Sequence, residues 1–279
     1  MTIYDMEVEM FIEIDGHQIY YEIIGQGTPV LCLHGYGVDH RIMKHPIESV
    51  VAQTDYAYSR IYIDLPGMGR SEVNPAIINA DDMLDVLMKF IRKVIKKQQF
   101  LIIGNSYGAY LSNGVNYKMD GCINGMFFFC PVIIADSEKR KLPVHQHILL
   151  EDIQPDDHQK EFKEFLNTNV IITRKNWQRY LDELVTGMTL ADNEFKKRYF
   201  DDGYSFSFER QMLAARHDCP MTVLVGRQDS TVGYDDAYNL VKDNESGSFI
   251  LLDEAGHNLQ IDQPKLFDAH LLHFFKIHQ

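Results

Sequence analysis

A serine enclosed by two glycines lies in the stretch FLIIGNSYGAY, residues 100–110. Ser106 has Gly104 two residues before it and Gly108 two residues after it. The apolar run before the serine predicts a buried strand, and a helix is expected to begin at about Tyr107. A tight strand-to-helix turn lifts a serine hydroxyl out of the sheet and needs small flanking residues. The pattern therefore predicts that Ser106 is a nucleophile; the alternative is a serine that only caps the following helix.

A serine hydroxyl needs a base to become an effective nucleophile, and His257 is the candidate among twelve histidines. It follows the last predicted strand, where Gly256 permits a sharp loop before a helix that begins near Pro264. In α/β sheets, ligands bind and functional residues lie at the carboxyl ends of the strands. His34 also follows a strand, but it precedes the serine in the motif HGYG, and we interpret it as support for that loop.

The base needs an acid that holds it in the correct tautomer, and Asp229 is the preferred candidate. It closes VLVGRQD, at the end of the next-to-last predicted strand, on a loop that begins with a glycine. Two other carboxylates are alternatives. Asp136 lies just after an earlier strand, and Asp253 lies close to His257 but is expected within the last strand.

Two backbone N–H groups are predicted to stabilise the negative charge that develops during attack on a carbonyl group. One belongs to Tyr107, directly after the nucleophile. The other belongs to Tyr36, in the loop HGYG at residues 34–37. In known cases each donor of this kind lowers the barrier by about 3 kcal/mol. These two donors would form an oxyanion hole, and Ser106, His257 and Asp229 would form a catalytic triad.

No metal ion or organic cofactor is expected. The pairs His145/His147 and His270/His273 have no carboxylate or cysteine cluster at ligand spacing, so we interpret them as surface side chains. The cysteines form no C-x-x-C pair and are interpreted as small buried hydrophobes in a reducing cytosol. They are Cys32, Cys122, Cys130 and Cys219.

The elements that must position these residues alternate between short apolar runs and longer amphipathic ones. An N-terminal hairpin is expected around Gly16, followed by buried strands within 29–35, 59–67, 100–104, 122–132, 221–229 and 248–256. An amphipathic helix is predicted after Asn79, its candidate N-cap, and a final helix from about Pro264 to Ile277. This alternation predicts an α/β protein with a mostly parallel sheet and helices on both faces.

The region 135–216 interrupts the alternation. It has no buried strand in its pattern, is rich in charged and aromatic residues, and contains the only tryptophan, Trp177. An insertion of this size is too long for a plain loop. We predict that 135–216 forms a helical cap, or lid, over one end of the sheet, while 1–134 and 217–279 form the core. The alternative is a helical decoration without contact to the active site.

Composition limits the partners of the chain. Its 279 residues are 45% hydrophobic, enough for a large core, and its net charge of −13 argues against nucleic acid and anionic membranes. The N-terminus lacks the features of a signal peptide, and the longest apolar run, residues 126–135, is too short to span a bilayer. We expect a cytoplasmic protein that acts on a small molecule, and a homodimer is left open.

The chain resembles the α/β-hydrolase superfamily. The matching motifs are HGYG at 34–37, DLPGMGRS at 64–71, GNSYGA at 104–109, GRQD at 226–229 and AGHNLQIDQP at 255–264. Their order and spacing cover nearly the whole chain outside the predicted cap. The resemblance implies an eight-stranded sheet, a helical lid inserted before the last two strands, and a triad of Ser106, Asp229 and His257.

Within that superfamily, the chain looks most like the lid-bearing branch of small esterases, C–C hydrolases and perhydrolase-like enzymes. Its nucleophile is serine and not aspartate, which departs from haloalkane dehalogenases and epoxide hydrolases. Ala109 stands where the commoner GxSxGG motif has its last glycine. Alanine is also small, so little consequence is expected.

The leading hypothesis is a hydrolase that cleaves a small carboxylic ester, thioester or lactone through an acyl-enzyme. The alternatives with the same triad cleave a C–C bond, an amide or an iminopeptide. An aminopeptidase would need an acidic site for the substrate amine, which EDIQPDD at 151–157 could supply. A ligand receptor without catalysis is disfavoured because all three triad positions are occupied. Trp177, Phe206 and Phe208 are candidates for the pocket wall or for the cap's own core.

Overall fold

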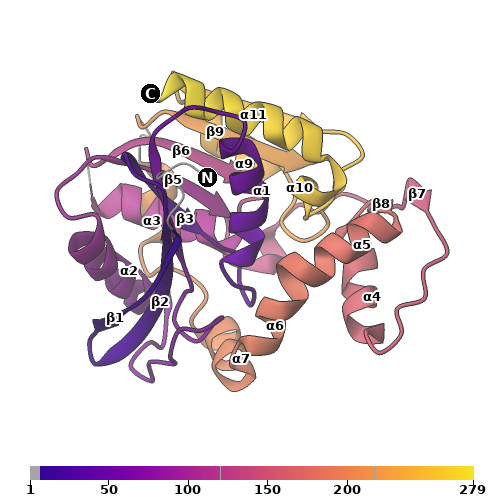
Figure 1. The fold of residues 1–279 in the computed structure, drawn as a ribbon, viewed down its shortest axis with the longest axis horizontal. Helices are drawn as coiled ribbons and strands as arrows, with labels where there is room; N and C mark the ends of the chain where they lie inside the picture. Colours follow the sequence, from indigo (N-terminus) through magenta and orange to yellow (C-terminus); the bar gives the residue numbers. More distant parts are fainter. Residues whose placement is uncertain (1–6, 120, 216–217) are drawn as a thin grey trace.

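An eight-stranded sheet forms the centre of the computed structural model, which describes residues 7–119, 121–215 and 218–279 (Figure 1). The strands are β1 (Glu7–Ile14), β2 (His17–Ile24), β3 (Thr28–Leu33), β4 (Tyr58–Ile63), β5 (Phe100–Asn105), β6 (Ile123–Phe129), β9 (Met221–Gly226) and β10 (Gly247–Leu252). Their order in the sheet is β1-β2-β4-β3-β5-β6-β9-β10. β2 is antiparallel to β1 and to β4, and the other neighbours are parallel. The prediction of an eight-stranded, mostly parallel sheet is confirmed.

The central strands are continuous apolar runs because both faces of the sheet are covered. Every residue of β5 and β9 is buried, whereas the edge strand β10 is only partly buried. The hairpin between β1 and β2 turns at Asp15 and Gly16, whose φ angles are 52° and 82°. Two positive φ angles in succession suit a tight hairpin turn, which explains why a glycine follows the aspartate.

Helices of the core follow the strands and cover the sheet. They are α1 (Arg41–Val51), α2 (Ala80–Val94), α3 (Tyr107–Lys118), α9 (Asp235–Val241), α10 (Leu259–Asp262) and α11 (Pro264–Ile277). α1 packs against α11, and α2 packs against α3. α2 begins at a capping box, in which the Asn79 side chain accepts from the backbone N–H of Asp82 at 3.1 Å, as the sequence predicted. α11 has Pro264 in its first turn and ends at Ile277, also as predicted.

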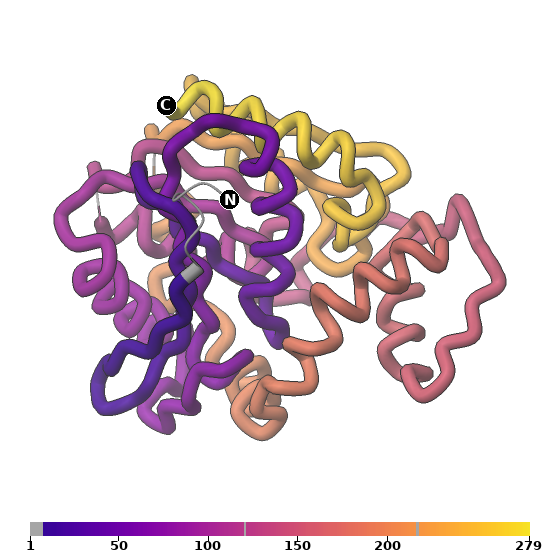
Figure 2. Tube along the Cα trace, in the orientation of Figure 1, coloured from indigo at the N-terminus to yellow at the C-terminus, as the bar shows by residue number. Residues whose placement is uncertain are grey.

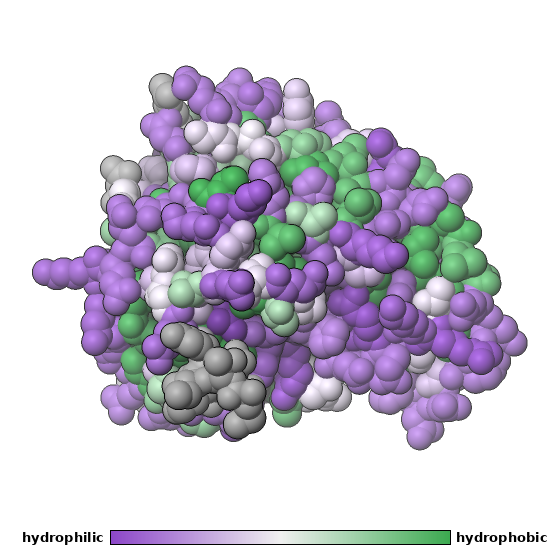
Figure 3. Space-filling model, turned by 45° about the horizontal axis from the view of Figure 1, so that its top comes forward, coloured by the Kyte–Doolittle hydropathy of each residue, from purple (hydrophilic) through white to green (hydrophobic). Residues whose placement is uncertain are grey.

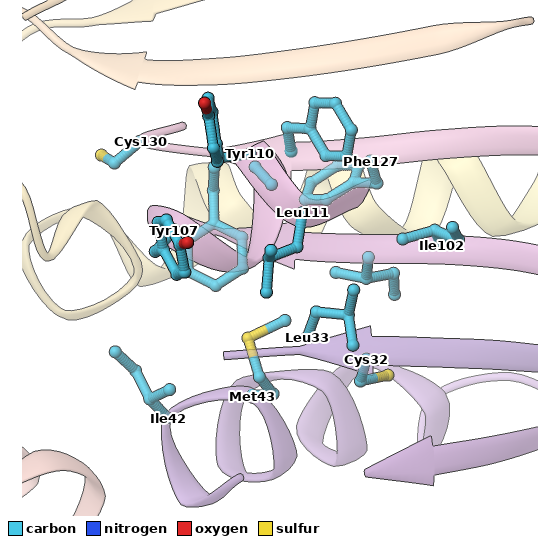
Figure 4. Close-up of a cluster of buried hydrophobic side chains, with 14 of the residues drawn as sticks. Cys32, Leu33, Ile42, Met43, Ile102, Tyr107, Tyr110, Leu111, Phe127 and Cys130 are labelled. Carbon is cyan, nitrogen blue, oxygen red and sulfur yellow. The ribbon is translucent and has the colours of Figure 1, made fainter. Parts of the chain in front are cut away.

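The hydrophobic core lies between the sheet and its helices. Figure 4 shows Leu33, Ile102 and Phe127 on neighbouring strands, with Met43 of α1 and Leu111 of α3 packed close to them. All five side chains are fully buried. The packing fixes β5 and α3 against each other, so that the turn between them has little freedom to change.

The segment between β6 and β9 forms a largely helical layer beside the sheet, at the lower right of Figure 1 and along the outer loop of the trace in Figure 2. It contains the short helices η1 (Ser137–Lys139), α4 (Gln159–Thr168), α5 (Arg174–Tyr180), the π-helix η2 (Leu181–Val185), α6 (Thr186–Leu190), α7 (Asn193–Asp202) and α8 (Glu209–Ala214). The predicted insertion before the last two strands is confirmed, and the exact domain boundaries at 134/135 and 216/217 stay a prediction.

Two details of this segment go beyond the sequence analysis: short strands that it did not predict, and a choice between the two positions that it left open for Trp177. It contains two strands of two residues each, β7 (Leu149–Leu150) and β8 (Ile171–Ile172), which are too short to leave a periodic signal. Trp177 packs among aromatic side chains of the same segment, with its ring centroid 5.3 Å from that of Phe165 and 5.8 Å from that of Tyr180. Trp177 therefore belongs to the core of this layer.

The surface shown in Figure 3 is mostly hydrophilic, with hydrophobic patches between charged and polar side chains. No helix among the described residues has the length and apolar character needed to cross a membrane.

Candidate active site

The turn at Ser106 is strained and closely packed. β5 ends at Asn105 and α3 begins at Tyr107, so Ser106 alone joins strand to helix, with a φ of 49° that non-glycine residues rarely adopt. A Cβ atom on Gly104 would lie only 2.7 Å from the Cα atom of Ala109. A Cβ atom on Gly108 would collide with the backbone of Leu33. The two glycines are thus required by close backbone contacts, and the strained turn presents the serine hydroxyl at the sheet's carboxyl edge.

The three side chains predicted as a triad lie in hydrogen-bond contact. The Nε2 atom of His257 lies 3.2 Å from Oγ of Ser106, and its Nδ1 atom lies 2.9 Å from Oδ2 of Asp229. The residues come from the loops after β10, β5 and β9, respectively. A parallel sheet brings these three carboxyl ends together although the residues are 151 and 28 positions apart in the chain.

Asp229 has the environment of a charged acceptor. It is fully buried, and its Oδ1 atom accepts from the backbone N–H groups of Thr231 and Val232 at 2.9 and 3.0 Å. Burial alone would raise the pKa of this carboxyl, but the adjacent His257 ring and these backbone donors outweigh burial and lower it. The charged carboxylate can only accept, so the hydrogen on His257 sits at Nδ1 and leaves Nε2 free to accept from the serine.

The two rival carboxylates are engaged elsewhere. Asp136 forms an ion pair with Lys139 at 2.9 Å, and its side chain caps η1 by accepting from the backbone N–H of Glu138. Asp253 was expected within the last strand, but β10 ends at Leu252 and the Asp253 carboxylate pairs with Arg227. Of the three carboxylates, only Asp229 forms a hydrogen bond with the His257 ring.

Both predicted oxyanion donors lie beside the serine. Tyr107 is the first residue of α3, and Tyr36 belongs with Gly35 to the wall of the cavity at Ser106. Among the described residues, neither backbone N–H has a hydrogen-bond acceptor within the protein. The loop is held by His34, which is completely buried, with Nε2 accepting from the backbone N–H of Leu65 at 2.9 Å. This contact fits the interpretation of His34 as support for the loop.

Comparison with known proteins assigns the fold to a family. The sequence model of the alpha/beta hydrolase family matches residues 30–269. The chain belongs to the α/β hydrolase family. An alpha/beta superfamily hydrolase from Oenococcus oeni PSU-1 superposes with a TM-score of 0.87 and 36% sequence identity, over 92% of this chain and 95% of that one. The predicted resemblance is therefore confirmed.

More distant relatives differ in the activities that they are named for. A 2-hydroxy-6-oxononadienedioate/2-hydroxy-6-oxononatrienedioate hydrolase from Paraburkholderia phymatum is 22% identical over 92% of this chain and 90% of its own length. The esterase RhEst1 from Rhodococcus sp. ECU1013 superposes with a TM-score of 0.73 at 16% identity, over 97% of this chain and 98% of that one. At such identities the structural likeness concerns the fold alone.

A cavity of about 500 Å³ opens at the serine and the histidine of this α/β hydrolase. The segment 135–216 supplies much of its wall, including Leu184, Met188, Phe200 and Tyr204. The alternative that this segment has no contact with the active site is therefore wrong. The proposed wall residues Trp177, Phe206 and Phe208 and the acidic stretch 151–157 are not among the lining residues. Phe206 instead stacks on Tyr110 with ring centroids 4.5 Å apart.

The side chains of the two predicted oxyanion residues both reach helix α7 or the turn after it. The Tyr36 hydroxyl donates to the backbone carbonyl of Lys196, and the Tyr107 hydroxyl oxygen lies 2.6 Å from that of Tyr199 and 3.3 Å from the carbonyl oxygen of Tyr204. Sequence reasoning used only the backbone of these tyrosines. The partners lie 92 to 160 residues away, so no local pattern could have indicated them.

A buried charge cluster supports the same side of the site. His40 donates from Nδ1 to Asp64 at 2.7 Å and from Nε2 to Glu22 at 2.9 Å. Burial would lower the pKa of His40, but its two carboxylate partners raise it to about 9, so the ring is positively charged at neutral pH. Asp39, His40 and Asp64 lie close enough to form a three-ligand group, but both ring nitrogens of His40 already bond carboxylates.

Neither predicted histidine pair belongs to a three-ligand group among the described residues, and on α11 His270 is half-buried while His273 is exposed. His145 and His147 both contact the carbonyl oxygen of Leu166. The remaining three-ligand group among the described residues is Cys130 with two of the triad residues. Burial raises the pKa of the Cys130 thiol well above its usual value, which keeps it protonated and a poor ligand.

Proposed function

We propose that this α/β hydrolase cleaves a small carboxylic ester, thioester or lactone through an acyl-enzyme at Ser106. The observation that carries the proposal is the hydrogen-bonded series from Ser106 Oγ through His257 to Asp229 at the end of a cavity of about 500 Å³. A cavity of that volume accommodates a small organic molecule. The apolar wall supplied by the segment 135–216 suits an acyl or alkyl chain.

In the proposed mechanism, Ser106 attacks the carbonyl carbon while His257 Nε2 takes the hydroxyl proton. Asp229 keeps the imidazole in the required tautomer and stabilises the imidazolium. The carbonyl oxygen becomes an oxyanion, and the backbone N–H groups of Tyr36 and Tyr107 donate to it. His257 then returns the proton to the departing alcohol or thiol, and the Ser106 ester remains.

Water completes the reaction by the same steps. His257 takes a proton from a water molecule as that water attacks the acyl-enzyme, and a second tetrahedral oxyanion forms at the same donors. Collapse of this intermediate returns the proton to Ser106 and releases the carboxylic acid. No metal ion or organic cofactor takes part in the proposal.

The proposal is tested with a fluorophosphonate probe and 4-nitrophenyl acetate. The wild-type protein should form a covalent adduct on the peptide that contains Ser106, and Ser106→Ala should lose both the adduct and the turnover. Ser137→Ala is a matched control, because Ser137 lies on the wall of the same cavity but the ring nitrogens of His257 bond Asp229 and Ser106 instead. Labelling of Ser106→Ala at the wild-type rate would contradict the proposal.

Cleavage of a C–C bond is the second candidate, supported by the similarity over most of the chain to the hydrolase from Paraburkholderia phymatum. The same serine, histidine and aspartate would serve it. Assays with a 2-hydroxy-6-oxo-dienoate and with simple 4-nitrophenyl esters separate the two. A kcat/KM at least 100-fold higher for the dienoate would favour C–C cleavage over ester cleavage.

A further inference from the structure

The cavity at Ser106 contains a guanidinium group without a carboxylate partner. Four arginines of the described residues are buried or half-buried: Arg41, Arg60, Arg140 and Arg179. Arg41, Arg60 and Arg179 each form an ion pair, with Asp39, Glu48 and Glu183, respectively. Arg140 forms none within the described part of the chain, and it is the one of the four that lines the cavity.

Backbone carbonyl groups hold Arg140 in place. Its Nε atom donates to the carbonyl of Ile134 at 2.8 Å, Nη2 to that of Ala135 at 2.8 Å, and Nη1 to that of Thr231 at 3.2 Å. A guanidinium has five N–H donors; beyond these three contacts, the side chain of Tyr204 on the same cavity wall is also a hydrogen-bond partner of Arg140. Carbonyl groups orient the guanidinium but do not neutralise its charge.

The nearby carboxylates of Asp136 and Asp236 form no ion pair with Arg140. Asp136 and Asp236 both feel the positive charge of Arg140, which acts to lower their pKa values. Asp136 is bound to Lys139 instead, and neither carboxylate lies within ion-pair distance of Arg140. A partly buried charge is normally paired, and the unpaired Arg140 lines the same cavity as Ser106.

We propose that Arg140 binds a carboxylate at the far end of the substrate, so that the preferred substrates are esters whose acyl chain ends in a second carboxylate. A guanidinium forms charge-assisted hydrogen bonds with a carboxylate, and a fixed guanidinium loses little entropy on binding. The inference rests on the proposed ester hydrolysis at Ser106 and adds the substrate class.

The charge of the rest of the molecule is negative and opposes binding of an anion. The chain carries a net charge of −13, and Glu164 also lines the cavity, so the general field disfavours an anionic substrate. A preference for an anion must therefore arise locally, at Arg140. The segment 135–216 contributes both Arg140 and Glu164, which places substrate selection in this insertion and bond cleavage in the core.

The test compares matched substrates. The 4-nitrophenyl half-esters of succinate, glutarate and adipate each have a neutral counterpart in which an isopropyl group replaces the terminal carboxylate. For at least one chain length, the wild-type kcat/KM should be at least ten-fold higher for the half-ester than for its counterpart. This preference should fall as ionic strength rises, because salt screens the pairing.

Variants of Arg140 test whether this residue causes the preference for the half-ester. Arg140→Met should lose at least ten-fold in kcat/KM for the half-ester and less than three-fold for the neutral ester, with an unchanged circular dichroism spectrum. Arg140→Lys should be intermediate, because lysine keeps the charge but not the planar pair of donors. Glu164→Gln is the matched control: it removes the other charge on the cavity wall and should keep or increase the preference.

Several results would overturn the inference. These are a wild-type preference for every neutral ester, a preference for an ester that carries an amine, and an equal loss on both substrates in Arg140→Met. If Arg140→Met does not fold, the wild-type preference and its salt dependence still decide. Failure of the proposed function is distinguishable, because then neither substrate series is cleaved in a manner that depends on Ser106.

Discussion

Replacing Asp229 with asparagine should nearly abolish turnover while leaving the fold intact. The structure gives the reason. Oδ1 of Asp229 accepts two backbone N–H groups, from Thr231 and Val232, so the single oxygen of an asparagine must occupy that place. The amide NH₂ group then faces Nδ1 of His257, where Oδ2 now lies at 2.9 Å.

That exchange reverses the tautomer of the base. An NH₂ group donates to Nδ1, so the ring hydrogen moves to Nε2, which can no longer accept the proton of Ser106. In serine triads a change of this kind lowers kcat by about 10⁴-fold, which corresponds to about 5 kcal/mol of barrier. Rotating the amide by 180° offers no escape, because it would direct two donors at the N–H groups of Thr231 and Val232.

Steady-state kcat on a 4-nitrophenyl ester measures the effect, and thermal unfolding of each variant excludes a loss of folded protein. Asp136→Asn is the matched control and should keep kcat within about three-fold, since its carboxylate pairs with Lys139 outside the triad. The reasoning would be refuted by a folded Asp229→Asn variant with near-normal kcat. A large loss of kcat in a folded Asp136→Asn variant would instead assign the role of the acid to Asp136, in the loop after β6.

Three further outcomes are expected. Ser106→Ala should reduce ester turnover to the uncatalysed background without a fall in melting temperature, and a large fall would mean that the serine is mainly structural. Gly108→Val should fail to fold or lose several kcal/mol of stability by denaturant unfolding, because its side chain would meet the backbone of Leu33; wild-type stability would contradict the packing described here. The pKa of His40 is raised to about 9 in the folded state, so the stability from its protonated ring is complete below about pH 6.5 and is lost as pH rises through 9. The free energy of unfolding should drop by up to about 3 kcal/mol between pH 6.5 and 9.5 and should drop less in His40→Gln; equal slopes would disprove a charged His40.

The arrangement of the predicted triad residues could be anticipated because each depends on a local signal. A glycine at each side of Ser106, a strand before it and a helix after it define one turn, and the structure has that turn. Asp229 and His257 each follow an apolar strand, and a parallel sheet brings such positions to one edge. Their contact geometry agrees with the prediction, while their catalytic roles stay predictions.

The cavity wall could not be anticipated, because it is made by contacts between segments far apart in the chain. The Tyr36 hydroxyl reaches a carbonyl 160 residues away, and Trp177 packs within its own layer, away from the cavity. Arg140 is one of many charged residues in its segment, and what distinguishes it is the lack of an ion pair within the described residues together with its place on the cavity wall. Helix positions within the insertion depend on side-chain packing, which periodicity does not encode.

The attachment of both predicted oxyanion residues to one stretch of the insertion has a mechanical consequence. Tyr36 and Tyr107 lie on different loops of the core, yet their hydroxyl groups bind Lys196, Tyr199 and Tyr204, which lie within nine residues of one another. Movement of α7 away from the sheet would break these hydrogen bonds and release both tyrosines at once. Opening of the cavity to admit a substrate through this side would thus loosen the predicted oxyanion hole, and closure would restore it, so that access and reactivity would alternate.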